Sequence, residues 1–139
     1  MSRQVPLRRR VRVVTAALLY QYRFFRENPQ EFNSAAHLLE EDPKVVEEAL
    51  EFFHRVLPHY EEIDSAIDRF ARWNPERLDL TDRAVIILGI YELLHTDTDP
   101  PVVINEAVEV AKMLSGGTSY RFVNAVLDKV TKEAANGAL

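Results

Sequence analysis

Apolar residues recur every three or four positions through most of the chain, which is the spacing of one face of an α-helix. Between residues 7 and 26 the recurring positions are Leu7, Val11, Val14, Leu18, Tyr22 and Phe25. Val13, Ala17 and Phe24 widen this stripe, so we expect the first helix to pack against several others. No stretch alternates apolar and polar residues with the period of two that marks a strand. The pattern therefore predicts an all-α fold.

Proline, glycine and capping residues divide the rest of the chain into six further predicted helices. We expect them over residues 30–39, 43–57, 59–73, 82–95 and 103–114, and from Thr118 or Ser119 to about residue 134. Asp42 and Thr81 are the expected N-caps of two of them, because their side chains can accept a hydrogen bond from a free backbone N–H. The segment 82–95 is apolar almost all round, which is typical of a central helix.

The length and the short connections predict one compact domain over residues 1–139. We expect about seven helices, arranged as two small helical bundles that meet near the first helix. Residues 1–6 and 134–139 are expected to be frayed, as chain ends without apolar anchors commonly are.

Charge is distributed unevenly along the chain. All seven charged side chains before Glu27 are arginines, whereas the whole chain has a net charge of −5, so the remainder carries −12. On the predicted first helix the arginines gather opposite the apolar stripe at Arg8, Arg9, Arg12, Arg23 and Arg26, with Tyr20 at their edge. Clustered guanidinium groups suit phosphate, and an aromatic ring can stack on an unpaired base. The pattern favours a surface for nucleic acid or anionic lipid; a solvated basic face is the alternative.

Composition and motifs exclude several classes of function. The absence of cysteine excludes disulfides and thiolate zinc sites, and it suits a cytoplasmic protein. No apolar run approaches the roughly 18 residues of a membrane span, and no signal peptide is evident. The chain has no nucleophile elbow, no glycine loop for phosphate and no catalytic triad candidate. We therefore expect a protein that is not an enzyme, with no cofactor and no contact with a membrane.

One pattern points to a different chemistry. Glu51 and His54 form a Glu-x-x-His motif, and Glu92 and His95 form a second. Pairs of such motifs on separate helices hold the metals of di-metal carboxylate bundles. Here the helices are short for that bundle and two further inward glutamates are not evident, so we expect no metal site. A di-metal bundle remains the less favoured alternative.

Two strings place a carboxylate among apolar residues: Tyr91-Glu92-Leu93-Leu94 and Ile104-Asn105-Glu106-Ala107. They fit two interpretations. Each string can belong to the core with a solvated rim, or both can form an acidic and apolar surface that docks a basic protein. The spacing alone favours the first interpretation.

Several longer strings occur in an order that resembles the bacterial NusB family of transcription antitermination factors. The strings are Asp82-Arg83-Ala84-Val85-Ile86, Tyr91-Glu92-Leu93-Leu94, Pro101, Ile104-Asn105-Glu106-Ala107-Val108-Glu109-Val110-Ala111-Lys112 and Phe122-Val123-Asn124-Ala125-Val126-Leu127-Asp128-Lys129. The arginine run followed by Ala17-Leu18-Leu19-Tyr20-Gln21 is similar to the start of that family. The resemblance covers nearly the whole chain and is strongest from residue 82 to residue 129.

The resemblance implies an all-helical, non-catalytic factor that works with NusE, a small-subunit ribosomal protein. The pair would bind single-stranded boxA RNA of ribosomal RNA operons and help the RNA polymerase antitermination complex read through terminators. The implied RNA-binding residues are Arg8, Arg9, Arg10, Arg12, Tyr20, Phe122 and Asn124. The implied partner surface lies around Asp82, Glu92 and Glu106. Some family members form homodimers, and the resemblance leaves a homodimer open for this chain.

A second role is compatible with the same resemblance. Similar domains are fused to RNA methyltransferases, so the alternative is an RNA-binding accessory module for processing or modification of ribosomal RNA. Three positions also depart from the family pattern. Ile87 stands where arginine is usual, Ala125 replaces glycine, and Thr118 replaces an acidic residue.

Overall fold

The computed structural model describes residues 4–26, 29–70, 79–116 and 120–137. These residues form seven α-helices and one 3₁₀ turn, with no strand among them, so the all-α prediction is confirmed. The elements are α1 (Leu7–Tyr22), α2 (Pro29–Leu39), α3 (Pro43–Val56), η1 (Leu57–His59), α4 (Tyr60–Phe70), α5 (Leu80–His95), α6 (Pro100–Ser115) and α7 (Tyr120–Ala135).

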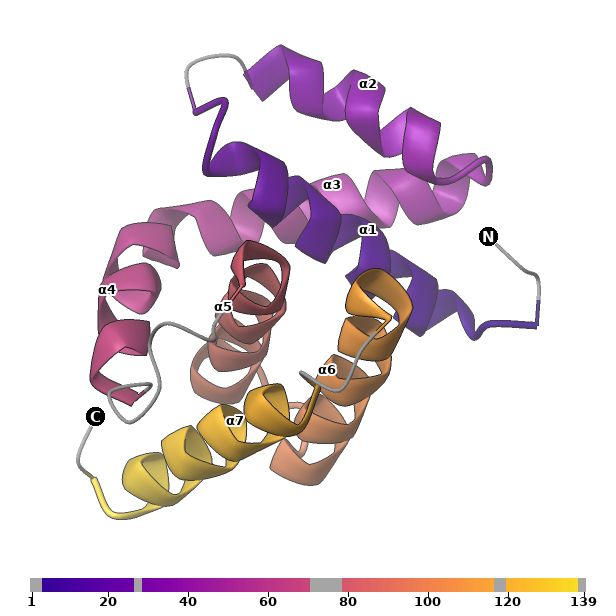
Figure 1. Ribbon diagram of the computed structural model, residues 1–139. Helices are drawn as coiled ribbons and strands as arrows, with labels where there is room; N and C mark the ends of the chain where they lie inside the picture. The colour runs from indigo at the N-terminus through magenta and orange to yellow at the C-terminus, as the bar shows by residue number, and fades with distance from the viewer. Residues whose placement is uncertain (1–3, 27–28, 71–78, 117–119, 138–139) are drawn as a thin grey trace.

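Helix α1 lies between two groups of helices (Figure 1). It packs against α2 and α3 on one side and against α5 and α6 on the other. Helices α5, α6 and α7 pack against one another, and α4 contacts α5 and α7. The two predicted bundles are therefore confirmed, with α1 as the element that they share.

The most buried helix is α5, as its apolar composition predicted. Every residue from Ala84 to Glu92 is buried, and the helix contacts α1, α4, α6 and α7. Gly89 permits a close approach to α7, because a Cβ atom at this position would lie 2.8 Å from Cδ1 of Leu127. The central helix therefore joins the two groups through a continuous hydrophobic core.

Two helix ends follow the predicted chemistry. Asp42 is the N-cap of α3, where its side chain accepts a hydrogen bond of 3.0 Å from the N–H of Lys44. Gly116 ends α6 in the left-handed conformation at a φ of 61°, and its N–H donates to the carbonyl oxygen of Lys112. The predicted caps Thr118 and Ser119 of the last helix lie outside the described residues.

Three predicted boundaries are wrong. Thr81 is not the cap of α5, because Asp79 accepts a hydrogen bond of 2.8 Å from the N–H of Asp82 and α5 begins at Leu80. Helix α6 begins at Pro100, since proline is tolerated in the first turn, where its missing N–H would have no partner. Helix α1 ends at Tyr22, and the N–H of Phe24 then donates to Gln21 in a tightened turn.

Candidate nucleic-acid interface

Helix α1 is buried on two sides. Its apolar stripe packs against α3, where the ring of Tyr22 lies 5.9 Å from that of Phe53 and Thr15 donates to the carbonyl oxygen of Ala49. The side that carries Arg9 and Arg12 was expected opposite this stripe. That side packs against α5 and α6 instead of facing open solvent, so its arginines need partners within the fold.

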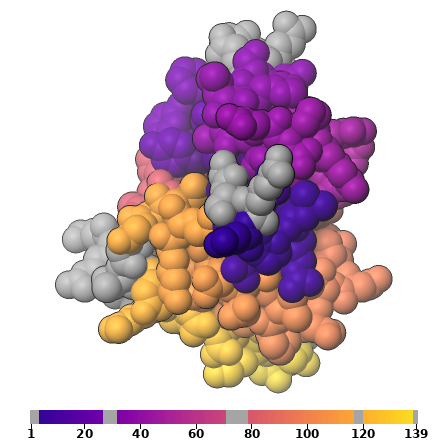
Figure 2. All heavy atoms as spheres, turned by 90° about the vertical axis from the view of Figure 1, so that its right-hand side faces the viewer, coloured from indigo at the N-terminus to yellow at the C-terminus, as the bar shows by residue number. Residues whose placement is uncertain are grey.

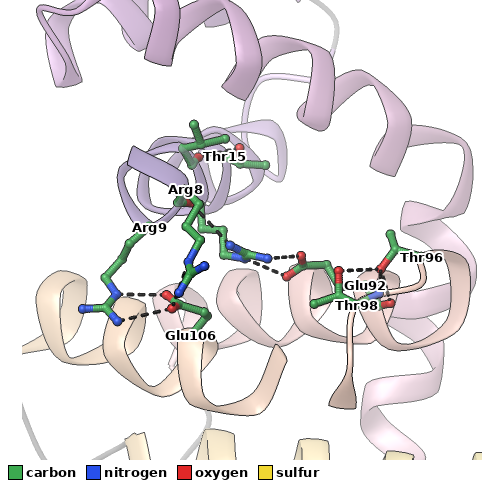
Figure 3. A network of polar contacts seen from close by, with 9 residues as sticks. Arg8, Arg9, Thr15, Glu92, Thr96, Thr98 and Glu106 are labelled. Carbon is green, nitrogen blue, oxygen red and sulfur yellow. Dashed lines mark hydrogen bonds and ion pairs between the residues drawn. The ribbon is translucent and has the colours of Figure 1, made fainter. Parts of the chain in front are cut away.

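Arg9 forms a two-point ion pair with Glu106 of α6 (Figure 3). Nε of Arg9 donates to Oε2 at 2.9 Å and Nη2 donates to Oε1 at 3.3 Å. Nε of Arg8 lies 3.7 Å from the same carboxylate. The side chain of Glu106 is 2% exposed, so this charge is buried beneath the two arginines.

Arg12 forms an equivalent pair with Glu92 of α5, and Glu92 is labelled in Figure 3. Its Nε donates to Oε2 at 3.0 Å and its Nη2 donates to Oε1 at 2.6 Å. The side chain of Glu92 is 4% exposed. The start of α1 is thus fixed to the α5–α6 pair by two charged contacts, one to each helix.

Arg10 points away from this group. It pairs with Glu40, which lies between α2 and α3 and also accepts a hydrogen bond of 3.2 Å from the N–H of Asp42. Both side chains of the Arg10–Glu40 pair are buried. Of the four arginines predicted to bind RNA, the structure therefore brings Arg8, Arg9 and Arg12 together, and we call these three the arginine row.

Two of these carboxylates, Glu106 and Glu40, are held in their charged form. The hydrogen bond from Arg9 lowers the pKa of Glu106, and the hydrogen bond from Arg10 lowers the pKa of Glu40. The arginine row carries three positive charges and lies on two negative ones, so the cluster has a net charge of +1. The basic character expected from the sequence is largely compensated within the fold.

The arginine row differs in exposure from one residue to the next. The side chain of Arg8 is 70% exposed, that of Arg9 is 23% exposed and that of Arg12 is 11% exposed. Figure 2 shows the first described residues in indigo, below the purple and magenta helices and beside orange α6. Arg8 is the member best placed to contact a ligand directly.

Tyr20 lies on the same side of α1 but further along. It is eight positions after Arg12, which corresponds to about 12 Å along a helix axis. Its exposed ring packs edge-on against Phe24 at 5.4 Å, and it lies beside Leu80 and Ile87 of α5. Ile87 is buried, so an apolar residue suits this position, where the family resemblance led us to expect arginine.

The two predicted residues of α7 lie in its first turns. Phe122 is half-buried against the hydrophobic core, and Asn124 is exposed. They are on a different element from the arginine row. Their role in binding RNA stays a prediction.

The three predicted partner-binding carboxylates are buried. Asp82 accepts a hydrogen bond of 2.9 Å from Oγ of Ser115, which ties the start of α5 to the end of α6. Glu92 and Glu106 hold the arginine row as described above. These side chains therefore lie below the surface, and for Glu92 and Glu106 this agrees with the core interpretation of their strings. Docking of a partner around their helices stays a prediction.

The paired Glu-x-x-His motifs do not form a metal site in the described part of the chain. Glu92 is occupied by Arg12, and the ring of His95 stacks on that of His59 at 4.0 Å. No group of three or more metal-ligating side chains occurs among the described residues. No helix in the same residues is long and apolar enough to cross a membrane.

Sequence reasoning missed Glu40 and the internal role of Glu92 and Glu106. A signal was present for the last two, because a carboxylate within an apolar helical string is rarely buried without a cationic partner. The partners are 80 and 97 positions away in the chain, so the pairs themselves could not be read from local spacing.

The fold and the site together define a small all-helical protein with an arginine row at the junction of two bundles. The model of the NusB family matches residues 9–132, and the chain belongs to this family. The transcription antitermination protein NusB of a Nitratiruptor species is 41% identical over 135 residues, covering 94% of this chain and 96% of the relative.

Solved structures agree with this assignment. The solution structure of NusB from Aquifex aeolicus has a TM-score of 0.81 and 25% identity, and the match covers 97% of this chain and 94% of that one. A crystal structure of the antitermination factors NusB and NusE in complex with dsRNA has a TM-score of 0.76 and 26% identity. That match covers 93% of this chain and 98% of the other.

Proposed function

We propose that this chain is a non-catalytic transcription antitermination factor that binds boxA RNA together with NusE. In this role it helps RNA polymerase read through terminators in ribosomal RNA operons. The observation that carries the proposal is the arginine row at the start of α1, in a chain that belongs to the NusB family. A protein that acts on nascent bacterial RNA works in the cytoplasm.

The RNA contact starts at Arg8. Its guanidinium is the most exposed of the row and can donate to phosphate oxygens without leaving another charge unpaired. Tyr20 offers an exposed ring on the same side of α1, where an unpaired base can stack. This combination suits single-stranded RNA, with Asn124 and Phe122 of α7 as further contacts.

NusE is the partner that makes the RNA site complete. A cluster with a net charge of only +1 binds RNA weakly and loses that binding as salt rises. A second protein that adds positive surface beside the row raises the affinity. We place NusE on the α5–α6 side, around the helices that carry Asp82, Glu92 and Glu106. A homodimer that covers the arginine row would compete with RNA for that surface.

Replacing Arg8 with alanine tests the RNA site. Arg8→Ala is expected to weaken binding of labelled boxA RNA to the chain with NusE by about tenfold, because one charged phosphate contact is lost. The slope of log affinity against log salt should also fall by about one. Fluorescence anisotropy at two salt concentrations gives both quantities.

Arg69→Ala is the matched control, because Arg69 is also an exposed arginine but lies on α4. It removes the same charge from the chain and should leave the affinity within about twofold of the starting protein. Equal losses for the two variants would show that RNA responds only to net charge, and the site at the arginine row would be refuted.

A further inference from the structure

We propose that Glu106 and Glu92 are positioning residues for the RNA site, which hold Arg9 and Arg12 in the orientation that phosphate requires. The inference rests on the proposed function and deepens it. It gives these two buried carboxylates a role in RNA affinity that does not require them to touch RNA or the partner protein.

The geometry of the two pairs supports this role. A guanidinium group has five N–H donors in one plane, and each carboxylate here takes one from Nε and one from Nη2. The Nη1 edge of each group is left out of the pair with the carboxylate, and in Arg12 one Nη1 donor reaches the backbone oxygen of Arg8 at 3.5 Å. A guanidinium bound side-on in this way can still present N–H donors to a phosphate.

The carboxylates also fix where those donors point. Glu106 belongs to α6 and Glu92 to α5, so the two pairs anchor neighbouring turns of α1 to two different helices. A free arginine side chain loses rotamer entropy when it is immobilised. Arg9 and Arg12 have lost this freedom before RNA arrives, which reduces the cost of binding.

Burial makes the arrangement specific. Glu106 is covered by Arg8 and Arg9, and the hydrogen bond from Arg9 keeps the pKa of its carboxyl low. An ionised carboxylate in such a place is costly unless it stays paired. Arg9 therefore cannot swing out to follow a phosphate, and RNA must meet the guanidinium where the carboxylate holds it.

A simple charge argument predicts the opposite effect of removing these carboxylates. If Glu106 only cancelled positive charge, its loss would raise the local charge from +1 to +2 and would strengthen RNA binding. If Glu106 positions Arg9, its loss weakens binding although the site becomes more positive. The sign of the change in affinity distinguishes the two accounts.

The test compares Glu106→Ala and Glu92→Ala with the starting protein in the presence of NusE, by anisotropy with labelled boxA RNA at two salt concentrations. Each variant is expected to bind about tenfold more weakly, and the salt slope should fall by about one as an arginine leaves its phosphate. Glu106→Gln keeps the size and one hydrogen-bond acceptor, so it should recover part of the loss. A purely structural role would lower the melting temperature without changing the salt slope.

Glu109→Ala is the matched control. Glu109 lies one turn after Glu106 on α6, and it pairs with Lys112 at 3.5 Å. Glu109→Ala removes one negative charge near the arginine row, as Glu106→Ala does, and should leave the affinity for RNA unchanged or slightly higher. If Glu106→Ala does not fold, Arg9→Lys provides a second test. Lysine keeps the positive charge, but it lacks the planar group of N–H donors with which arginine can bind a carboxylate and a phosphate at the same time. Arg9→Lys should also weaken binding about tenfold.

Two results would be decisive against the inference. Folded Glu106→Ala that binds as tightly as the starting protein, or more tightly, overturns the positioning role and leaves the proposed function intact. An Arg9→Lys variant that binds RNA as tightly as the starting protein would also overturn the positioning role and leave the proposed function intact. A starting protein that fails to bind boxA RNA with NusE refutes the proposed function itself.

Discussion

At the scale of single residues, acidic side chains pair with the arginines of α1 and compensate much of their charge. Arg8, Arg9, Arg10 and Arg12 of α1 all take part in ion pairs within the chain, as do Arg23 and Arg26 just after the helix. The sequence predicted that this end of the chain is basic, but it could not predict the compensation. Ion pairs between residues 80 and 97 positions apart depend on how the bundles meet, which local spacing does not report.

These pairs predict how stability responds to acid. Glu106 and Glu40 have pKa values below their ordinary 4.5, because Arg9 and Arg10 hydrogen-bond to the charged carboxylates. A lowered pKa in the folded state means that the stabilisation is complete above pH 4.5. It is then lost as the pH falls from 4.5 through the folded-state values. The melting temperature should therefore drop steeply over that acid range.

Variants identify the source of this drop. A Glu106→Gln, Glu40→Gln double variant should melt lower near neutral pH and show a shallower fall below pH 4.5, since two of the linked protons are gone. Glu133→Gln on α7 serves as a control. An identical acid profile in the double variant and the starting protein would contradict the assigned pairs.

At the scale of elements, the period of apolar residues predicted the α-helices of the described residues, whereas side-chain caps account for only some of their ends, such as the starts of α3 and α5. The start of α5 shows why boundaries are harder. Asp79 and Thr81 are both good N-cap residues and lie two positions apart, so the sequence offers two starts of similar quality. Only the conformation of the chain selects Asp79. The two prolines before residue 102 predict a turn, although the first of them begins α6.

Alanine substitutions at the two candidates for the cap test the start of α5. Asp79→Ala is expected to reduce the free energy of unfolding by about 1 kcal/mol, because the N–H of Asp82 loses its acceptor. Thr81→Ala should change it by less than about 0.5 kcal/mol. Urea unfolding of the two variants gives both values. A larger loss for Thr81→Ala would contradict the assignment of Asp79 as the cap.

At the scale of the whole molecule, α1 is the element that both bundles share and the element that carries the arginine row (Figure 1). The same contacts that join the bundles also hold two arginines of the row. This arrangement links the fold to the proposed RNA site, because disturbing the contact of α1 with α5 and α6 would disturb the arginines. The family resemblance pointed to this surface from the sequence, and the dual use of its side chains became visible only in the structure.

The weak net charge of the row explains why a partner is needed. The acidic remainder of the chain repels RNA at long range. The arginine row and its two carboxylates have a net charge of only +1, which is too small to offset this repulsion. Affinity for a particular RNA must then come from oriented contacts and from surface that NusE adds. We therefore propose that this chain recognises boxA RNA jointly with NusE.

The most direct measurement is the affinity of the starting protein for single-stranded boxA RNA, with and without NusE, beside a scrambled strand and a duplex of the same sequence. Fluorescence anisotropy at two salt concentrations is sufficient. We expect tight binding that requires NusE and prefers the single-stranded boxA sequence. Equal, weak and salt-sensitive binding to all three RNAs, unchanged by NusE, would contradict it.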